Sequence, residues 1–318
     1  MEKKILVAVD GSKRGFEAAS ILGELLKEQS QLGIVLFHCV HQLGAVQADD
    51  LCTSMYESCK LPIGDQEKVG HEILDEALRC ILEKGFPKER IEVRLKTNSL
   101  DPALDIIAEA ELRNYETIAM GRRGRGNLET LLLGSVSGKV AHYAPRHSVW
   151  VVDTPVFDTN RVLIAMEGDP DSLELVRYAA DILTSIPHLE YTFLHIMPSV
   201  PPTFWDDGHI LSPDEDKDPR SRLERWRTEW TTSVERFMSR GRLQLMEKGV
   251  PEKNIQTLIL PTRQGVARDL LQAIENHRFK VVFMGKKSLH ERKPFLMGSH
   301  SNKILQMSKG IILCLVDF

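Results

Sequence analysis

The chain has 318 residues, of which 42% are apolar and 27% are charged, and its formal net charge is −4. This composition is typical of a globular chain with room for roughly two domains. The small acidic excess gives no reason to expect nucleic acid or an anionic membrane surface as a partner.

No targeting segment is predicted at the start of the sequence. The apolar run Ile5–Val9 is too short for a signal sequence, and no run approaches the ~20 apolar residues of a membrane span. The cysteines form no CxxC pair and no zinc-ligand spacing; they are Cys39, Cys52, Cys59, Cys80 and Cys314. We therefore predict a cytoplasmic protein with reduced thiols. A contact between Cys52 and Cys59 stays open.

Short apolar runs alternate with amphipathic segments through the first half of the chain. Strands are predicted at Ile5–Val9, Ile34–Val40, Ile91–Leu95, Thr117–Met120 and Ser148–Val152. Helices are predicted at Gly15–Leu26, Val69–Leu82, Leu100–Ala110 and Ser137–Tyr143, whereas 41–61 has no firm period. This alternation predicts right-handed βαβ units, a mainly parallel sheet and a ligand site beyond the carboxyl ends of its strands.

The same series begins again after Thr154-Pro155. Its strands are predicted at Arg161–Glu167, Tyr191–Met197, Ile255–Leu260, Val281–Gly285 and Ile311–Val316. Asp10 and Glu167 are 157 residues apart, as are His38 and His195, whereas Gly121 and Gly285 are 164 apart, as are Gly134 and Gly298. The sequence therefore contains a duplication, with domains at 1–154 and 155–318.

The two offsets differ by seven residues, which indicates a net insertion in the second copy. We place it at 198–229, a proline-rich and then acidic stretch that contains or adjoins Trp205, Trp226 and Trp230. A solvated loop that leads into a longer helix anchored by tryptophan is predicted there. A surface for a protein partner is the alternative.

The fourth strand of the first copy leads into a basic, glycine-rich loop. It contains Gly121, Gly124 and Gly126 together with Arg122, Arg123 and Arg125, and a helix begins at Gly134-Ser135-Val136-Ser137. Free backbone N–H groups at a helix start attract anions, and glycine lets the backbone approach a phosphate closely. The arginines would add charge-assisted bonds or lie solvated on the rim of the loop.

The strand-one segment Val-Ala-Val-Asp10-Gly-Ser, followed by Gly121-x2-Gly124-x9-Gly134-Ser135, resembles the universal stress protein family. Two copies in one chain resemble its tandem members. The resemblance implies two α/β, Rossmann-like domains, each a doubly wound five-stranded parallel sheet with strand order 3-2-1-4-5. It also implies adenine nucleotide binding and pairing of the fifth strands, here as an intrachain pseudo-dimer, with a further homodimer left open.

The resemblance assigns the ligand to the first copy. Asp10 would approach the adenine or ribose above Ala8 and Val9, and Val40 would offer its backbone to the adenine edge. Met120, Gly121 and Gly124 would line the ribose and phosphates. The phosphates would be held by the N–H and hydroxyl groups of Gly134, Ser135, Val136 and Ser137, with Arg123 beside them.

The second copy departs from this pattern. Glu167 replaces the aspartate, and Ser288 stands in place of the second glycine, although Gly298, Ser299 and Ser301 remain. Its loop stays basic through Lys286, Lys287, Arg292 and Lys293, and Pro294 stiffens it. The second copy is therefore predicted to have the weaker site or to be a structural partner without ligand.

The main functional hypothesis is a cytoplasmic tandem stress protein whose first domain binds ATP, or ADP or AMP, as a regulatory ligand, with Mg²⁺ on the phosphates. A slow ATP hydrolase is a second hypothesis, and its only candidates for activating water or holding a metal beside the γ-phosphate are Glu129 and Asp10. A nucleotide-independent scaffold for an unknown protein partner is a third. No catalytic or metal-ligating residue is predicted, and His38 and His195 are expected to make a shared core hydrogen bond.

Overall fold

The computed structural model describes residues 3–41, 63–124, 133–199, 219–286 and 297–318. The chain divides into two compact units. The first comprises Met1–Asp158, Ser185–Pro187 and Gly285–Asp317; the second comprises Thr159–Thr184 and His188–Met284, with Phe318. The final helix and strand of the second copy thus belong to the unit of the first copy.

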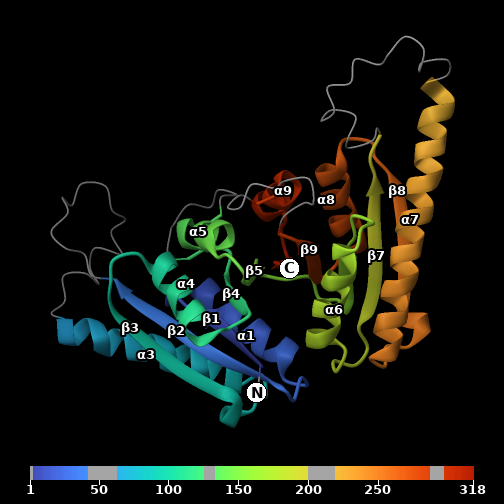
Figure 1. The fold of residues 1–318 in the computed structure, drawn as a ribbon. Coiled ribbons are helices and arrows are strands. Elements are labelled where there is room, and N and C mark those ends of the chain that lie inside the picture. Colours follow the sequence, from blue (N-terminus) through green and yellow to red (C-terminus); the bar gives the residue numbers. More distant parts are fainter. Residues whose placement is uncertain (1–2, 42–62, 125–132, 200–218, 287–296) are drawn as a thin grey trace. The chain divides into compact units, whose positions relative to one another are not determined.

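The first unit contains six neighbouring strands in the order β3-β2-β1-β4-β5-β10 (Figure 1). Its strands are β1 (Lys3–Ala8), β2 (Leu32–His41), β3 (Ile91–Ser99), β4 (Thr117–Gly121), β5 (Ser148–Val152) and β10 (Ile312–Val316). Strands β1 to β5 pair in parallel, which confirms the predicted order 3-2-1-4-5 for this copy.

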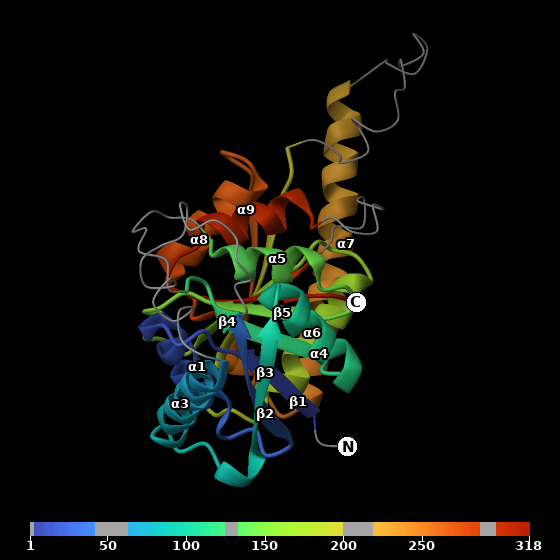
Figure 2. The same cartoon turned by 90° about the vertical axis from the view of Figure 1, so that its left-hand side faces the viewer.

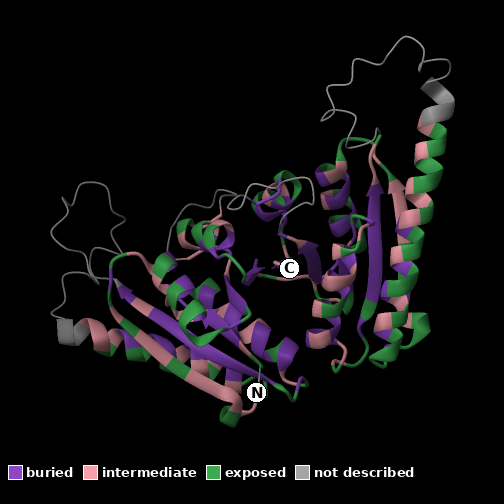
Figure 3. Ribbon diagram, in the orientation of Figure 1, coloured by how far each residue is buried: buried purple, intermediate pink, exposed green. Residues whose placement is uncertain are grey.

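Helices cover both faces of this sheet (Figure 2). They are α1 (Lys13–Leu26), α3 (Ile63–Leu82), α4 (Pro102–Arg113), α5 (Ser135–Tyr143) and α9 (Ser299–Met307), with a 3-10 turn η2 (Lys88–Arg90). Helices α1 and α3 pack together, as do α4 and α5. Because both faces are covered, the middle of each central strand is buried; Ile5, Leu6 and Val7 are at most 1% exposed (Figure 3).

The second unit repeats the arrangement with four neighbouring parallel strands in the order β9-β6-β7-β8, which agrees with the predicted order 3-2-1-4. Its strands are β6 (Arg161–Ala165), β7 (Glu190–Met197), β8 (Ile255–Pro261) and β9 (Val281–Gly285). Its helices are α6 (Asp171–Leu183), α7 (Pro219–Glu247) and α8 (Val266–His277), with η4 (Glu252–Asn254). Helix α7 has 29 residues against 20 in its counterpart α3, which confirms the longer helix. Residues 200–218 of the predicted insertion at 198–229, with Trp205, lie outside the described residues.

The fifth strands of the two copies pair with each other. Strands β5 and β10 are antiparallel, with Trp150 opposite Cys314 and Val151 opposite Leu313. Trp150 and Cys314 are themselves equivalent residues, because they are 164 positions apart. A local two-fold relation between the two strands therefore passes through this one pair.

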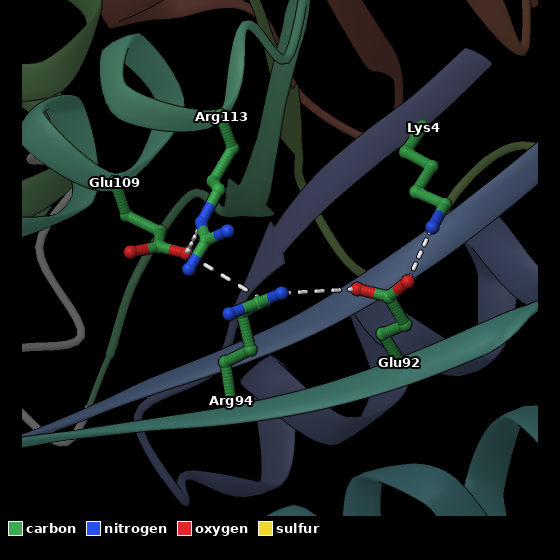
Figure 4. A network of polar contacts seen from close by, with 5 residues as sticks. All are labelled: Lys4, Glu92, Arg94, Glu109 and Arg113. Carbon is green, nitrogen blue, oxygen red and sulfur yellow. Dashed lines mark hydrogen bonds and ion pairs between the residues drawn. The ribbon is translucent and has the colours of Figure 1, made fainter. Parts of the chain in front are cut away.

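Charged side chains lie between the end strand β3, strand β1 and helix α4 (Figure 4). Glu92 accepts from Lys4 and lies 3.4 Å from Arg94 Nη2. Glu109 Oε1 lies 3.6 Å from Arg94 Nε and 3.8 Å from Arg113 Nε. The hydrogen bond from Lys4 and the neighbouring arginine lower the pKa of Glu92. The network links α4 to β3 and places charges on a strand that would otherwise offer an apolar edge.

Two further predictions concern the whole chain. Among the helices of the described ranges, none has both the length and the apolarity needed to cross a membrane. Cys39, Cys80 and Cys314 are free thiols, whereas Cys52 and Cys59 lie outside the described residues.

Candidate functional site

The carboxyl ends of β1 and β4 bring the predicted motifs of the first copy together. The two strands are neighbours, with Ala8 paired to Met120, so the residues that follow them share one edge of the sheet. Asp10 follows β1, and Gly121 ends β4. Val9 and Met120 are buried beneath this edge, at 5% and 4% exposure.

The Asp10 carboxylate is enclosed between two glycines. Its Oδ1 accepts hydrogen bonds from the N–H of Ser12 at 3.0 Å and from the Ser12 hydroxyl at 2.7 Å. A Cβ at Gly15 would lie 2.6 Å from Oδ1, and a Cβ at Gly124 would lie 2.2 Å from Oδ2. Because both distances are far below van der Waals contact, a side chain at either position would displace the carboxylate or the backbone that faces it. Sequence reasoning found Asp10 and Gly124 but missed Ser12 and Gly15.

The loop after β4 is held to helix α5 by its backbone. Gly134 N–H donates to the carbonyl of Arg122 at 3.0 Å, and the Ser137 hydroxyl donates to the carbonyl of Gly121 at 2.8 Å. The same two bonds recur in the final segment, from Gly298 to Lys286 and from Ser301 to Gly285. The predicted phosphate donors Gly134 and Ser137 are thus engaged within the protein, and their repetition in both copies indicates a structural role.

The first turn of α5 keeps its remaining N–H groups available. Gly134 is the N-cap and provides no side-chain cap, and the ladder of the helix begins with Gly138 N–H on Gly134 O. The N–H groups of Ser135 and Val136 have no acceptor within the helix. Beside this turn, Arg123 Nε is buried and makes no hydrogen bond among the described residues. An uncapped helix start beside an unsatisfied guanidinium nitrogen suits an anion.

Val40 and His38 shape the opposite side of the site. The Val40 side chain packs against α3, because a Cβ at Gly70 would come within 2.8 Å of Val40 Cγ2. His38 Nδ1 donates to Val9 O at 2.7 Å, and His195 Nδ1 donates to Met166 O at the same distance. The prediction that both histidines make the same core hydrogen bond, each within its own copy, is confirmed. In both copies the bond fixes the carbonyl that precedes the strand-one acid.

Both roles predicted for Arg122 are wrong. Its side chain is 2% exposed and donates to the carbonyls of Gln306 and Ser308, so it neither lies on the rim of the loop nor reaches toward an anion. Loop sequence alone gave no signal for this contact, because its acceptors are more than 180 positions away. Arg125, Gly126 and Glu129 lie outside the described residues, as do Lys287, Ser288, Arg292, Lys293 and Pro294.

The end of strand one is built differently in the second copy. Ser172 takes the place of Gly15, 157 positions later, and its Oγ accepts from the N–H groups of Glu167 and Gly168 at 3.2 and 3.3 Å. The same hydroxyl donates to Asp169 Oδ1 at 2.8 Å. The serine side chain therefore occupies the space that Gly15 leaves for the Asp10 carboxylate. The change from aspartate to glutamate is paired with a change from glycine to serine.

Helix α7 closes over this end of strand β6 within the second unit. A Cβ at Gly168, which has φ +84°, would lie 2.5 Å from Val234 Cγ2. Trp230 Nε1 donates to His195 Nε2 at 3.0 Å, and Trp226 lies against Trp230 with ring centroids 5.9 Å apart. The predicted tryptophan-anchored helix is confirmed. Because an indole N–H is only a donor, His195 Nε2 is an acceptor and the ring is neutral.

We expect this histidine to make the stability of the protein depend on pH. Burial lowers the pKa of His195, against weaker opposing effects of Met166 O and Asp169. The unfolded chain therefore takes up this proton first, and the stabilisation is complete above about pH 6.5 and is lost as pH falls through the lower folded-state pKa. In urea titrations between pH 7.5 and 5, His195→Gln should lose less stability on acidification than wild type. Parallel curves for the two proteins would contradict this.

No metal centre is visible in the ranges the structure covers: none of their His, Cys, Asp and Glu side chains form a group of three that could hold an ion.

Comparison with known proteins agrees with the fold and the duplicated motifs. The model of the universal stress protein family matches residues 1–153 and again 159–313. Universal stress protein YxiE of Bacillus subtilis is 33% identical over 144 residues, which cover 44% of this chain and 93% of that protein. A universal stress protein of Methanothermobacter thermautotrophicus is 38% identical over 79 residues, 24% of this chain and 50% of that protein.

Solved structures extend the likeness along the chain. A universal stress protein from Archaeoglobus fulgidus has a TM-score of 0.62 at 20% identity and covers 100% of this chain and 99% of its own. A putative universal stress protein from Pseudomonas aeruginosa has a TM-score of 0.59 at 13% identity, covering 99% and 93%. At these identities the likeness concerns the fold. The chain is a tandem α/β protein, and it belongs to the universal stress protein family.

Proposed function

We propose that the first copy binds an adenine nucleotide as a regulatory ligand, ATP in the first place and ADP or AMP as alternatives. The observation that carries the proposal is the Asp10 carboxylate, held between Gly15 and Gly124 beside the uncapped start of α5. A fixed carboxylate suits the hydroxyls of a ribose or the amino group of a base, and a helix start suits phosphate. The two lie on one edge of the sheet.

The residues of the site divide between the parts of the ligand. Asp10 faces the ribose or base, over the floor of Ala8, Val9 and Met120. The Val40 backbone meets the adenine edge. The glycine backbone at 121 and 124 borders the ribose and phosphates.

The phosphates are assigned to the N–H groups of Ser135 and Val136 and to Arg123, whose buried Nε makes no hydrogen bond among the described residues. Gly134 and Ser137 act by shaping the loop, since their donors are used on Arg122 and Gly121. A Mg²⁺ ion would be held by the phosphates, and in that position it would offset their charge.

The proposal extends to the organisation of the chain. We assign domains to 1–154 and 155–318 and infer that they form an intrachain pseudo-dimer through β5 and β10 in the cytoplasm. We propose that the second domain does not bind a nucleotide in this manner, because Ser172 and Trp230 occupy the space at the carboxyl ends of its strands. A second dimerisation between chains and a protein partner in a stress response belong to the same hypothesis.

Equilibrium dialysis of the full chain with labelled ATP tests the proposal. One equivalent of ATP per chain is expected. Asp10→Ala should weaken binding about tenfold or more, since a charge-assisted hydrogen bond contributes roughly 1.5–3 kcal/mol. Glu111→Ala, an exposed change on α4, is the control and should bind as wild type does. Equal binding by wild type and Asp10→Ala, two equivalents per chain, or no binding would each contradict the proposal.

A further inference from the structure

The first unit contains two buried cations that hold helix ends in a reciprocal way. Arg122 follows the last residue of β4, and Lys286 follows the last residue of β9, 164 positions later. Their side chains are buried, at 2% and 3% exposure. Arg122 donates to the carbonyls of Gln306 and Ser308 at the C-terminus of α9, and to Ser308 Oγ at 3.4 Å. Lys286 donates to the carbonyl of Ala144, the C-cap of α5.

The acceptors of these two side chains, like the two donors, occupy equivalent positions in the two copies. Ala144 and Ser308 are 164 positions apart, and each is the C-cap of its helix. Each cation therefore holds the end of the helix that belongs to the other copy. Carbonyls at a helix C-terminus have no partner within the helix, and a cation there is stabilised by the helix dipole.

The backbones of the same two residues hold the opposite ends of the helices. Arg122 O accepts from Gly134, the N-cap of α5, and Lys286 O accepts from Gly298, the N-cap of α9. Arg122 N–H donates to Val152 O on β5, and Lys286 N–H donates to Val316 O on β10. The contacts thus close a ring: α5 to Arg122, Arg122 to α9, α9 to Lys286, and Lys286 back to α5.

We propose that Lys286, which the second copy contributes, is a positioning residue for the ligand site of the first copy. It acts through α5, whose C-terminus it holds and whose N-terminus carries the Ser135 and Val136 amides. The second copy would then support the first site through these reciprocal contacts of Lys286 and Arg122 with α5 and α9, whether or not it binds a ligand of its own. The inference rests on the proposed function for its effect on affinity.

Affinity for ATP in the full chain is the first measurement. Lys286→Met removes the charge and the donor and should raise the Kd for ATP about fivefold or more, the lower end of a typical coupling between sites. Lys286→Arg should restore binding to within about twofold, since Arg stands at the equivalent position 122. Lys309→Met removes an exposed charge next to Ser308, the C-cap of α9, and should bind as wild type does. A purely structural role would lower the melting temperature of Lys286→Met without changing its Kd well below that temperature.

Hydrogen exchange without ATP is the second measurement. In Lys286→Met the amides of α5 should exchange faster than in wild type and in Lys309→Met, and in Arg122→Met the faster exchange should appear in α9. Lys286→Gln, which keeps a neutral donor, replaces the Met variant if that variant does not fold. If wild type binds ATP and Lys286→Met binds it with the same Kd, the inference is overturned and the proposed function stands. If wild type binds no ATP, the proposed function fails, and the hydrogen exchange of the α5 amides alone decides whether Lys286 holds this helix. Unchanged exchange in Lys286→Met would overturn that role, and faster exchange would support it.

Discussion

Gly124→Ala is expected to weaken ATP binding about tenfold or more while leaving the fold of the chain intact. The added methyl would lie 2.2 Å from Asp10 Oδ2. The end of a flexible side chain could usually move away from such a clash. Here Oδ1 is bound by both donors of Ser12, and the space behind it exists only because residue 15 is glycine. The carboxylate must therefore leave its bonds, or the loop must move off the site.

A double-mutant cycle makes this expectation specific. If the methyl acts by displacing the carboxylate, Gly124→Ala should cost little further affinity in an Asp10→Ala background, because the clashing atom is gone. Contacting residues typically show such non-additive effects of roughly 0.5–3 kcal/mol. Dialysis or calorimetry on the four proteins gives the result, with Glu111→Ala as the reference for an unrelated substitution. Additive losses of affinity would show that Gly124 acts independently of Asp10.

Much of the arrangement around the candidate site could be predicted because it depends on local sequence. The alternation of apolar runs gave the strands, and the two constant offsets gave the duplication and the placement of the inserted residues. Asp10, Gly121, Gly124 and Ser135 follow strand ends or begin a helix, and the edge of a parallel sheet brings such positions together. The longer α7 followed from the same arithmetic.

The parts that sequence reasoning missed depend on contacts between distant segments. A basic residue in a glycine-rich loop is predicted to be solvated or to bind phosphate. The neighbouring sequence gives no indication that Arg122 is buried against residues 306 and 308. The serine hydroxyl of Ser137 was interpreted as a ligand donor, whereas its repetition at Ser301 reveals a bond that fixes the loop. That second bond was detectable in principle, since an identical serine in the copy with a weaker motif favours structure over binding.

The membership of the last segment could not be deduced from sequence either. The offsets place 285–317 in the second copy, yet these residues belong to the compact unit of the first. The physical reason lies in the seam between the two copies, which we define as the paired strands β5 and β10 together with the two cations that join α5 and α9. The sequence copies and the compact units therefore differ in where they place helix α9 and strand β10.

Trp150→Ala is expected to destabilise the protein by about 3–5 kcal/mol, the usual cost of removing a buried large aromatic side chain. Trp150 is 0% exposed and lies between Ala119 on β4 and Cys314 on β10. Loss of the indole leaves a cavity at the centre of the seam that the neighbouring small side chains cannot fill. Urea unfolding should show the loss as a lower midpoint, and Cys314→Ala, which removes a single sulfur at the opposite position, should cost much less.

From the same pair we expect β5 to pair better with β10 than with the β5 strand of a second chain. The local two-fold relation places residue 150 opposite its own equivalent, so a symmetric pairing of two first copies would set one indole against another. Duplication has allowed a large residue to face a small one. Cys314→Trp should therefore destabilise by overpacking, roughly 1–3 kcal/mol, even though it recreates the symmetric pair. If Cys314→Trp were as stable as wild type, the seam would have room for both indoles, and size complementarity at this pair would not be what selects the partner of β5.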